Sequence, residues 1–282
     1  MSRIAEIRRS VEDYRSTELI TSALQDIGAT KMQLIRKQFE TNAQFFAGIR
    51  EVYGIVKGHV LNTKQPDGGA ASASAPARDI YLALTSNKRF YGTLNRDIMR
   101  SLAHVMETTP DNSDFVVIGQ TGAQQLESSG FTGTVKRIEF ADDTPNPHEL
   151  QDLLTLIDPY TRVFVIYPKF INTFRQDIAM TDVTQTPSTA VSTEVKVEYI
   201  FEPEIPNILK FFEAQVRRAL FERVMIETEL ARAAARTMKM RDARDRAGDL
   251  RKQFERGLRR EQATLADLEL METFIGFSFW KQ

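Results

Sequence analysis

Apolar residues at helical spacing predict a long helix at the end of the chain. Residues 207–282 contain no proline and only three glycines, and most of their other positions favour helix. Successive apolar positions lie 4, 3, 4, 4, 7 and 3 residues apart, which is typical of a coiled-coil seam: Ala243, Ala247, Leu250, Phe254, Leu258, Leu265 and Leu268. At about 1.5 Å per residue such a helix would extend for roughly 110 Å, so it needs a partner helix.

The start of the chain has the same character. Residues 2–60 are free of proline, and their apolar positions predict a second seam: Ile4, Ile7, Val11, Tyr14, Ile20, Leu24, Ile27 and Leu34. We expect the two helices to pair antiparallel, with residues 4–27 beside residues 243–268. The alternative is two unrelated surface helices on a globular domain.

Short apolar runs alternate with helical patterns between the two ends. The pattern predicts strands over residues 79–85, 114–119, 135–140 and 162–167, an edge strand over 194–201, and helices over 95–107 and 148–157. Alternation of this kind indicates an α/β domain with a largely parallel sheet. Residues 65–77 form a low-complexity loop that contains no apolar anchor.

The predicted fold class is therefore α/β, with long N- and C-terminal helices forming an antiparallel coiled coil and a central Rossmann-like α/β domain. The expected divisions are an N-terminal coiled-coil helix (1–64), the loop (65–77), the central domain (78–203) and a C-terminal coiled-coil helix (207–282).

Composition removes several function classes. The 282 residues include 37 basic and 38 acidic residues, giving a formal charge of −1, and no cysteine. A disulfide framework, a thiolate metal site and a cysteine nucleophile are thereby excluded. The charged N-terminus predicts no signal peptide, and the absence of a long apolar run predicts no membrane span, so we expect a soluble, cytoplasmic protein.

Few residues suggest chemistry. The turn from Gly119 to Gly122 follows a buried strand, where a phosphate could bind, but it lacks the length and the Lys-Ser/Thr ending of a P-loop. A tight turn leading into a helix is the favoured interpretation. The histidines have no metal-ligand spacing (His59, His104 and His148), and the pair Asp142 and Asp143 is interpreted as a solvated turn. We predict no catalytic residues, no metal and no cofactor.

Residues 232–260 are basic, with eleven Lys or Arg against four Asp or Glu. Such a helix can bind nucleic acid, but Phe254 is the only aromatic residue there on which a base could stack. A solvated face of a coiled coil is the favoured interpretation. A third interpretation is that the basic helix docks into an acidic ring formed by another protein.

Several short segments, in order along the chain, carry a resemblance to a known family. In the N-terminal part they are Glu6-Ile7-Arg8, the run from Ser16 to Leu24, and Lys31-Met32. In the centre they are the run from Thr85 to Asn95, the run from Lys169 to Thr173 with Gln176, and Phe201-Glu202-Pro203. In the last helix they are Ala235-Arg236, Met240, Asp245, Ala247-Gly248, Glu269-Leu270, Glu272 and Gly276. In their joint order these segments resemble the gamma subunit of the F-type ATP synthase, the central-stalk rotor.

The chain also departs from the family pattern. Leu19 stands where the family has a lysine, Gln262 and Ala263 stand where it has an Arg-Gln pair, and a glycine-rich turn is replaced by the run from Lys88 to Thr93. These departures concern contacts with the catalytic head rather than the architecture.

The resemblance implies a non-catalytic rotor shaft that couples ion-driven rotation to ATP synthesis or hydrolysis. It implies as partners the alpha and beta catalytic subunits, an epsilon-type stalk subunit and the membrane rotor ring, with no nucleic acid, at the cytoplasmic face of the membrane. The implied contacts with the catalytic ring are Arg8, Thr17, Leu19, Ile20, Arg236, Met240, Arg259, Arg260, Gln262, Glu269 and Glu272. The α/β domain forms the foot of the shaft in this family, and the implied contacts of the foot are Lys88, Arg89 and Gly92. The alternatives are a subunit of a hydrolysis-only F-type-like ATPase, an enzyme with a Rossmann-like core, and a scaffold coiled coil.

Overall fold

The computed structural model describes residues 3–63, 78–109, 113–128, 135–184 and 205–279. The chain divides into two compact units, one of residues 30–235 and the other of residues 1–29 with 236–282. The terminal helices α1 (Arg3–Thr63) and α5 (Ile205–Phe279) each run through both units. Each unit is described below by itself.

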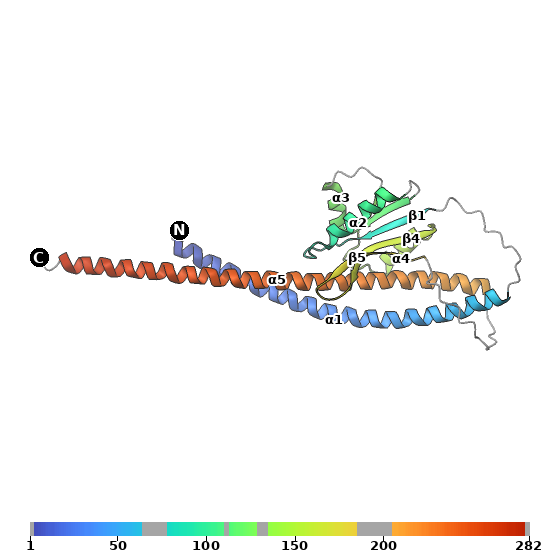
Figure 1. The fold of residues 1–282 in the computed structure, drawn as a ribbon, viewed down its shortest axis with the longest axis horizontal. Helices are drawn as coiled ribbons and strands as arrows, with labels where there is room; N and C mark the ends of the chain where they lie inside the picture. The colour runs from blue at the N-terminus through green and yellow to red at the C-terminus, as the bar shows by residue number, and fades with distance from the viewer. Residues whose placement is uncertain (1–2, 64–77, 110–112, 129–134, 185–204, 280–282) are drawn as a thin grey trace. The chain divides into compact units, whose positions relative to one another are not determined.

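A five-stranded sheet forms the centre of the larger unit (Figure 1). Its strands are β1 (Asp79–Leu84), β2 (Ser113–Ile118), β3 (Val135–Ile138), β4 (Arg162–Phe170) and β5 (Gln176–Asp182), in the order β3-β2-β1-β4-β5. The pairs β1–β2, β1–β4 and β2–β3 are parallel and β4–β5 is antiparallel, which confirms the largely parallel sheet. The pattern had not predicted β5, and the edge strand predicted over residues 194–201 lies outside the described residues.

Three short helices connect the strands: α2 (Leu94–Thr108), α3 (Gln120–Ser128) and α4 (Pro147–Ile157). The start of α4 is fixed by its sequence, because the Asn146 side chain accepts hydrogen bonds from the backbone N–H groups of His148 and Glu149. The Glu149 carboxylate in turn accepts from the Asn146 N–H. This capping box, with Pro147 in the first turn, is a strong helix start.

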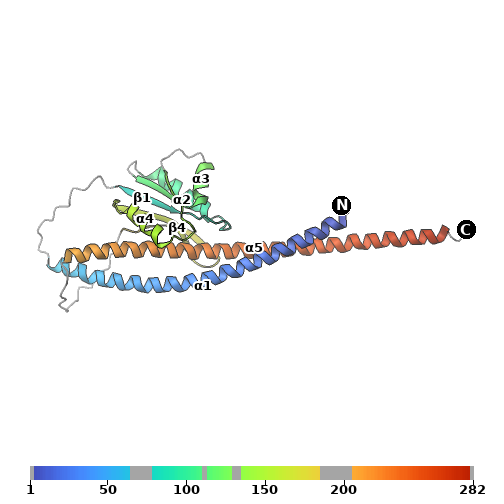
Figure 2. The ribbon, with the colours of Figure 1, turned by 180° about the vertical axis from the view of Figure 1, so that it is seen from behind.

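Alternation along the strands divides the core into two layers. Side chains at even positions of β1, such as Ile80 and Leu82, pack with α4 and with the α5 residues Val216 and Phe221. The opposite face, which includes Tyr81 and Ala83, packs against α2 and α3. Figures 1 and 2 show α2 and α3 on one side of the sheet and α5 on the other. Phe46 of α1 belongs to the same cluster as Val216 and Phe221, so both terminal helices contribute side chains to the core of this unit.

The smaller unit is an antiparallel helix pair. Arg3 pairs with Glu261 at 3.2 Å, and the Tyr14 ring stacks on that of Phe254 with 5.3 Å between centroids. Nearer the other end of the pair, Arg251 Nε donates to Glu18 Oε2 at 2.9 Å. The antiparallel pairing predicted from the sequence is confirmed, but residues 3–28 lie beside residues 237–261 rather than beside residues 243–268.

The predicted seam of α1 is correct only in its first half. Buried and half-buried positions recur at alternating intervals of three and four: Ile4, Ile7, Val11, Tyr14, Glu18, Thr21, Gln25 and Gly28. Ile20 and Ile27 are instead 59% and 63% exposed, Leu34 in the larger unit is 63% exposed, and Leu24 is 37% exposed. The prediction followed apolar residues, whereas the heptad phase set by Ile4 passes through polar ones.

The seam of α5 is also shorter than expected. Ala247 is buried and Phe254 and Leu258 are half-buried, but Leu250, Leu265 and Leu268 are 37%, 47% and 57% exposed. The last two lie beyond Glu261, where α1 no longer accompanies α5 (Figure 1). No helix among the described residues is long and apolar enough to cross a membrane.

Candidate functional site

The glycine turn after β2 is packed against the chain itself and leaves no room for a phosphate. A Cβ on Gly122 would lie 2.4 Å from Thr85 Oγ1, and Gly119, at φ +106°, would meet Thr85 O at 2.5 Å. The amides of this turn already donate within the chain: Gly119 to Ile138 O, Gln120 to Asn87 Oδ1, Thr121 to Ser86 O and Gly122 to Thr85 Oγ1. A phosphate cradle needs free N–H groups, so the structure favours the tight turn.

The histidines are the other candidates for a metal or catalytic site. Among the described residues no group of three His, Asp or Glu is placed to hold a metal ion. His104 and His148 are exposed, His148 Nδ1 lying 3.0 Å from Asp152, and the side chain of His59 lies outside the described ones.

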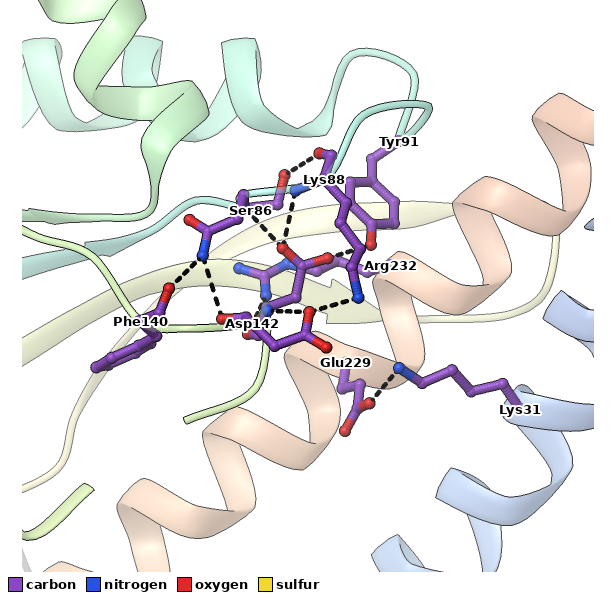
Figure 3. A network of polar contacts seen from close by, with 10 residues as sticks. Lys31, Ser86, Lys88, Tyr91, Phe140, Asp142, Glu229 and Arg232 are labelled. Carbon is purple, nitrogen blue, oxygen red and sulfur yellow. Dashed lines mark hydrogen bonds and ion pairs between the residues drawn. The ribbon is translucent and has the colours of Figure 1, made fainter. Parts of the chain in front are cut away.

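Asp143 corrects the interpretation of the acidic pair as a solvated turn. Its carboxylate accepts hydrogen bonds from the backbone N–H groups of Asn87 at 2.6 Å and Lys88 at 3.0 Å, and from the Tyr91 hydroxyl. Asp142 is exposed and pairs with Lys88 Nζ at 2.5 Å (Figure 3). The pair therefore joins the loop after β3 to the loop after β1.

Arg232 connects these two loops to α5. The residue is only 6% exposed. Its Nη2 donates to Leu84 O at 3.0 Å and Thr85 O at 2.7 Å, and its Nη1 donates to Asp143 O at 3.0 Å. Figure 3 shows Arg232 reaching from α5 into this network, while Glu229, three positions earlier, pairs with Lys31 of α1 at 2.7 Å.

Charge compensation makes this buried arginine tolerable. Burial lowers the pKa of the Arg232 guanidinium, and the charge of Asp143 opposes that shift. Burial would raise the pKa of the Asp143 carboxyl, but the hydrogen bonds from Tyr91, Lys88 and Asn87 and the charge of Arg232 outweigh it, so the pKa is lowered. The lowered pKa of Asp143 keeps its carboxyl ionised near neutral pH, and an arginine side chain keeps its proton in proteins, so two opposite charges lie close together here.

A second polar contact fastens α5 to the sheet. The Tyr167 hydroxyl of β4 donates to the Glu227 carboxylate at 3.1 Å, and burial raises the pKa of Tyr167. Together with Arg232 it forms what we call the anchor: Arg232, Asp143, Tyr91, Tyr167 and Glu227. The anchor holds α5 to the carboxyl end of β1 and to β4.

Most predicted ring contacts lie on the surface of the smaller unit. Leu19 and Ile20 are 65% and 59% exposed, and the other exposed members are Arg8, Thr17, Arg259, Arg260, Gln262, Glu269 and Glu272. Met240 is only 5% exposed and Arg236 is half-buried, because both occupy the seam. We therefore leave Met240 out of the contact surface.

The predicted foot residues lie in the loop between β1 and α2. Lys88 takes part in the network through Asp142 and Asp143, whereas Arg89 is exposed. Gly92 has φ +64°, so a glycine suits this turn, and Phe90 has φ +74° although it carries a side chain.

Sequence reasoning missed the anchor. In the sequence, Arg232 was considered only as one residue of the basic stretch 232–260. Its neighbours carry the signal that it is buried, since the structure buries every residue from 230 to 235. An arginine inside such a run needs a buried acceptor. No local pattern, however, identifies Asp143 and the end of β1 as its partners.

Comparison with known proteins agrees with this architecture. A family model described as ATP synthase matches residues 3–278. The chain is 26% identical over 270 residues to the ATP synthase gamma chain of Psychrobacter sp. (strain PRwf-1), and 26% identical over 271 residues to that of Psychrobacter cryohalolentis, with 89% of both chains covered in each case.

Two solved structures share the fold. The first is the central stalk/c-ring of the Tetrahymena thermophila mitochondrial ATP synthase (TM-score 0.59, 19% identity, 79% of this chain and 99% of that chain). The second is the Euglena gracilis mitochondrial ATP synthase OSCP/F1/c-ring (TM-score 0.52, 12% identity, 89% and 94%).

These comparisons support neither an enzyme with a Rossmann-like core nor a scaffold coiled coil. Because the family model covers almost the whole chain and its relatives are gamma chains, the chain belongs to the gamma-subunit family of the ATP synthase, whose members are non-catalytic central-stalk subunits.

Proposed function

We propose that this central-stalk subunit turns inside a ring of alpha and beta catalytic subunits and contacts them through the smaller unit. The observation that carries the proposal is the surface of α5 beyond Glu261, where every residue from 262 to 276 is exposed. Six of these are large apolar residues: Leu265, Leu268, Leu270, Met271, Phe274 and Ile275. An exposed apolar surface of this extent is typical of a partner interface.

The outer face of α1 supplies a second contact surface. Leu19, Ile20 and Ile27 are each more than half exposed on the side of α1 that does not face α5, because the seam uses other positions. The helix pair therefore presents an apolar face on α1 and a basic face on α5. A shaft that turned would offer each catalytic subunit these faces in succession, and differential binding to open and closed subunits would shift their populations.

The α/β domain within the larger unit, residues 78–203, acts in this proposal as the foot of the shaft. Lys88, Arg89 and Gly92 would lie toward the membrane rotor ring and an epsilon-type stalk subunit. The complex would be peripheral, at the cytoplasmic face of the membrane. Support comes from the stalk neighbour, whose structure was solved together with a c-ring. We assign residues 1–64 and 207–282 to the shaft and residues 78–203 to the foot.

The anchor gives the foot a mechanical role. Torque between foot and shaft must pass through contacts between the sheet and α5, and Arg232 makes three hydrogen bonds to backbone carbonyls there. Charge-assisted hydrogen bonds contribute about 1.5–3 kcal/mol each, and apolar burial of Val216 and Phe221 adds to them.

The arginines next to the altered positions Gln262 and Ala263 provide the test. We propose that Arg259 and Arg260 form ion pairs with carboxylates of the ring, in place of the contacts that the family's Arg-Gln pair makes. In the complex assembled with its alpha and beta subunits, replacing both arginines by alanine should lower ATP turnover several-fold. Gln262→Ala, the matched control, should leave turnover within roughly twofold because a neutral amide forms weaker bonds.

If the complex with the double variant assembles and turns over ATP normally, Arg259 and Arg260 do not form the proposed ion pairs with the ring. If the unaltered chain does not copurify with alpha and beta subunits, the shaft proposal itself fails.

A further inference from the structure

We propose that Lys31 of α1 closes a ring of six alternating charges, and that this ring positions α1 against the foot, so that torque enters both terminal helices. The anchor described above joins only α5 to the sheet. The ring adds α1, and its members come from α1, α5 and the loops that follow β1 and β3. All of them belong to the larger unit: Lys31, Asp142, Lys88, Asp143, Arg232 and Glu229. The inference rests on the proposed function, because it takes the chain to transmit torque.

The foot side of the ring is held by direct contacts. Lys88 Nζ lies 2.5 Å from Asp142 Oδ1, and the Lys88 backbone N–H donates to the Asp143 carboxylate at 3.0 Å. Arg232 Nη1 donates to the backbone oxygen of Asp143 at 3.0 Å. Burial lowers the pKa of Arg232, and the charge of Asp143 opposes that shift. On this side, two loops of the foot are therefore tied to each other and to α5.

The helix side of the ring is formed by Lys31 and Glu229. Lys31 Nζ lies 2.7 Å from Glu229 Oε1 (Figure 3). The hydrogen bond from Lys88 is the main cause that lowers the pKa of the Asp142 carboxyl, and the charge of Lys31 lowers it further. The charge of Glu229 is among those that oppose the effect of burial on Arg232. The signs therefore alternate around a closed ring, and a network of charges contributes more than an isolated surface pair.

Lys31 is the member that brings α1 into the ring. The side chain of its partner Glu229 is only 18% exposed, so this carboxylate needs a cation nearby. The apolar contacts of α1 with α5 in the same region, such as those of Met32 and Ile35 with the cluster around Leu230, are not directional. A polar contact can specify the register of two paired helices. Lys31 is therefore placed to set the register in which α1 lies against α5 and the foot.

The competing interpretation is an isolated ion pair between α1 and α5. The side chain of Lys31 is 51% exposed, and isolated pairs at such positions contribute little. The two interpretations differ in what happens when the two charges are exchanged. An isolated pair works in either orientation, whereas a ring accepts only one, because each member also faces a second neighbour of opposite sign.

The first test exchanges the two charges in the free full-length chain. Lys31→Glu alone and Glu229→Lys alone should each lower the urea concentration at the midpoint of unfolding, followed by circular dichroism. When both changes are combined, the ring predicts no recovery of the midpoint, because a carboxylate then lies near Asp142 and an ammonium group near Arg232. Lys37→Glu, at an exposed position of α1, is the matched control and should change the midpoint little. Recovery of the midpoint in the combined variant overturns the ring.

The second test measures coupling in the assembled complex, reconstituted in membrane vesicles. Lys31→Met removes the charge and keeps a long side chain that suits a helix. ATP hydrolysis is followed by phosphate release, and ion pumping by a voltage-sensitive dye. We expect hydrolysis to change little while ion pumping per ATP falls roughly twofold or more, because a loosely positioned α1 leaves the torque to α5 alone. Lys37→Met, the control, should leave this ratio unchanged.

The ratio of pumping to hydrolysis separates positioning from stability, since a purely structural role of Lys31 would reduce the amount of complex without altering the ratio. An unchanged ratio in the Lys31→Met complex refutes the positioning role. If the unaltered complex hydrolyses ATP without pumping ions, or the chain does not copurify with alpha and beta subunits, the proposed function fails and the coupling role fails with it. The charge exchange in the free chain still decides whether the ring exists, so the two failures are distinguishable.

Discussion

Glycine has opposite roles at different positions in this chain. Gly122 touches Thr85 and Val117 so closely that an added Cβ would lie 2.4 Å and 2.7 Å from their side-chain atoms. Gly257 has open space instead. The same residue type therefore permits close packing of α3 in the foot and leaves a stretch of helix in the shaft uncovered.

Alanine at these two positions should have effects of opposite sign. Gly122→Ala should lower the free energy of unfolding by about 1–3 kcal/mol, because the core must shift to accept the methyl group. Gly257→Ala should raise it by about 0.5–1 kcal/mol through helix propensity. Urea denaturation of the free chain, followed by circular dichroism, measures both. Equal effects would show that the packing differences described here do not govern stability.

Asp143 should make stability depend on acid pH. Its pKa is lowered in the folded chain, so its contribution is present above the unfolded value, about 4, and is lost as the pH falls through the folded value. At pH 7 the Asp143→Asn variant should be less stable by roughly 1.5–3 kcal/mol, since a charged acceptor is lost beside Arg232.

The check is the difference between the two proteins in urea denaturation from neutral to acid pH. The difference should shrink as the carboxyl of the unaltered chain becomes protonated. Asp267→Asn, at an exposed position on α5, should show little difference at any pH. If the difference in the free energy of unfolding between the unaltered chain and Asp143→Asn persists unchanged into strong acid, the charge of Asp143 does not contribute to stability.

The helix pair illustrates how an element can bury polar residues and expose apolar ones. Its seam on α1 passes through Glu18, Thr21 and Gln25, of which Glu18 bonds to Arg251 across the pair. Polar seam positions weaken a coiled coil but fix its register. The apolar residues Ile20 and Ile27 are left on the outer face, where a partner can cover them.

A disulfide across the seam tests this register. A Cβ at position 28 would lie 3.5 Å from Thr237 Cβ, which is within the span that a disulfide bridges. Gly28→Cys combined with Thr237→Cys should therefore cross-link under mild oxidation, in a chain that has no cysteine of its own. Ile27→Cys with Thr237→Cys is the control and should not, because Ile27 faces away from the seam. Efficient cross-linking of the control pair alone would place the seam on the originally predicted face.

For the whole molecule, the C-terminal part of α5 stands apart as an uncovered helix. Residues 262–276 of α5 have no part of α1 beside them and are exposed throughout. Helices that lack tertiary packing are marginal in water, so our proposal expects the subunits around this stretch to stabilise it. The sheet of the larger unit, by contrast, is buried on both faces.

Hydrogen exchange should separate these two regions. In the free chain the amides of residues 264–276 should exchange orders of magnitude faster than those of β1, because helix fraying opens them at little cost. Assembly with alpha and beta subunits should slow exchange in this stretch and leave β1 unchanged. Strong protection of the stretch in the free chain, measured by mass spectrometry, would show that it needs no partner.

The sequence by itself determined the two long helices, four of the five strands and the family, because each is encoded in local periodicity or in short ordered segments. Tertiary structure alone decided three things: which face of α1 forms the seam, that β5 completes the sheet, and that Arg232 bonds to Asp143, 89 positions away. A periodic pattern shows that a side chain is to be buried, but not by which distant group. The seam passes through Gly28 and Thr237, which lie in close contact across the helix pair. It does not pass through the more apolar Leu24 and Ile27, which are exposed, because pairing depends on the shape and charge of the partner helix.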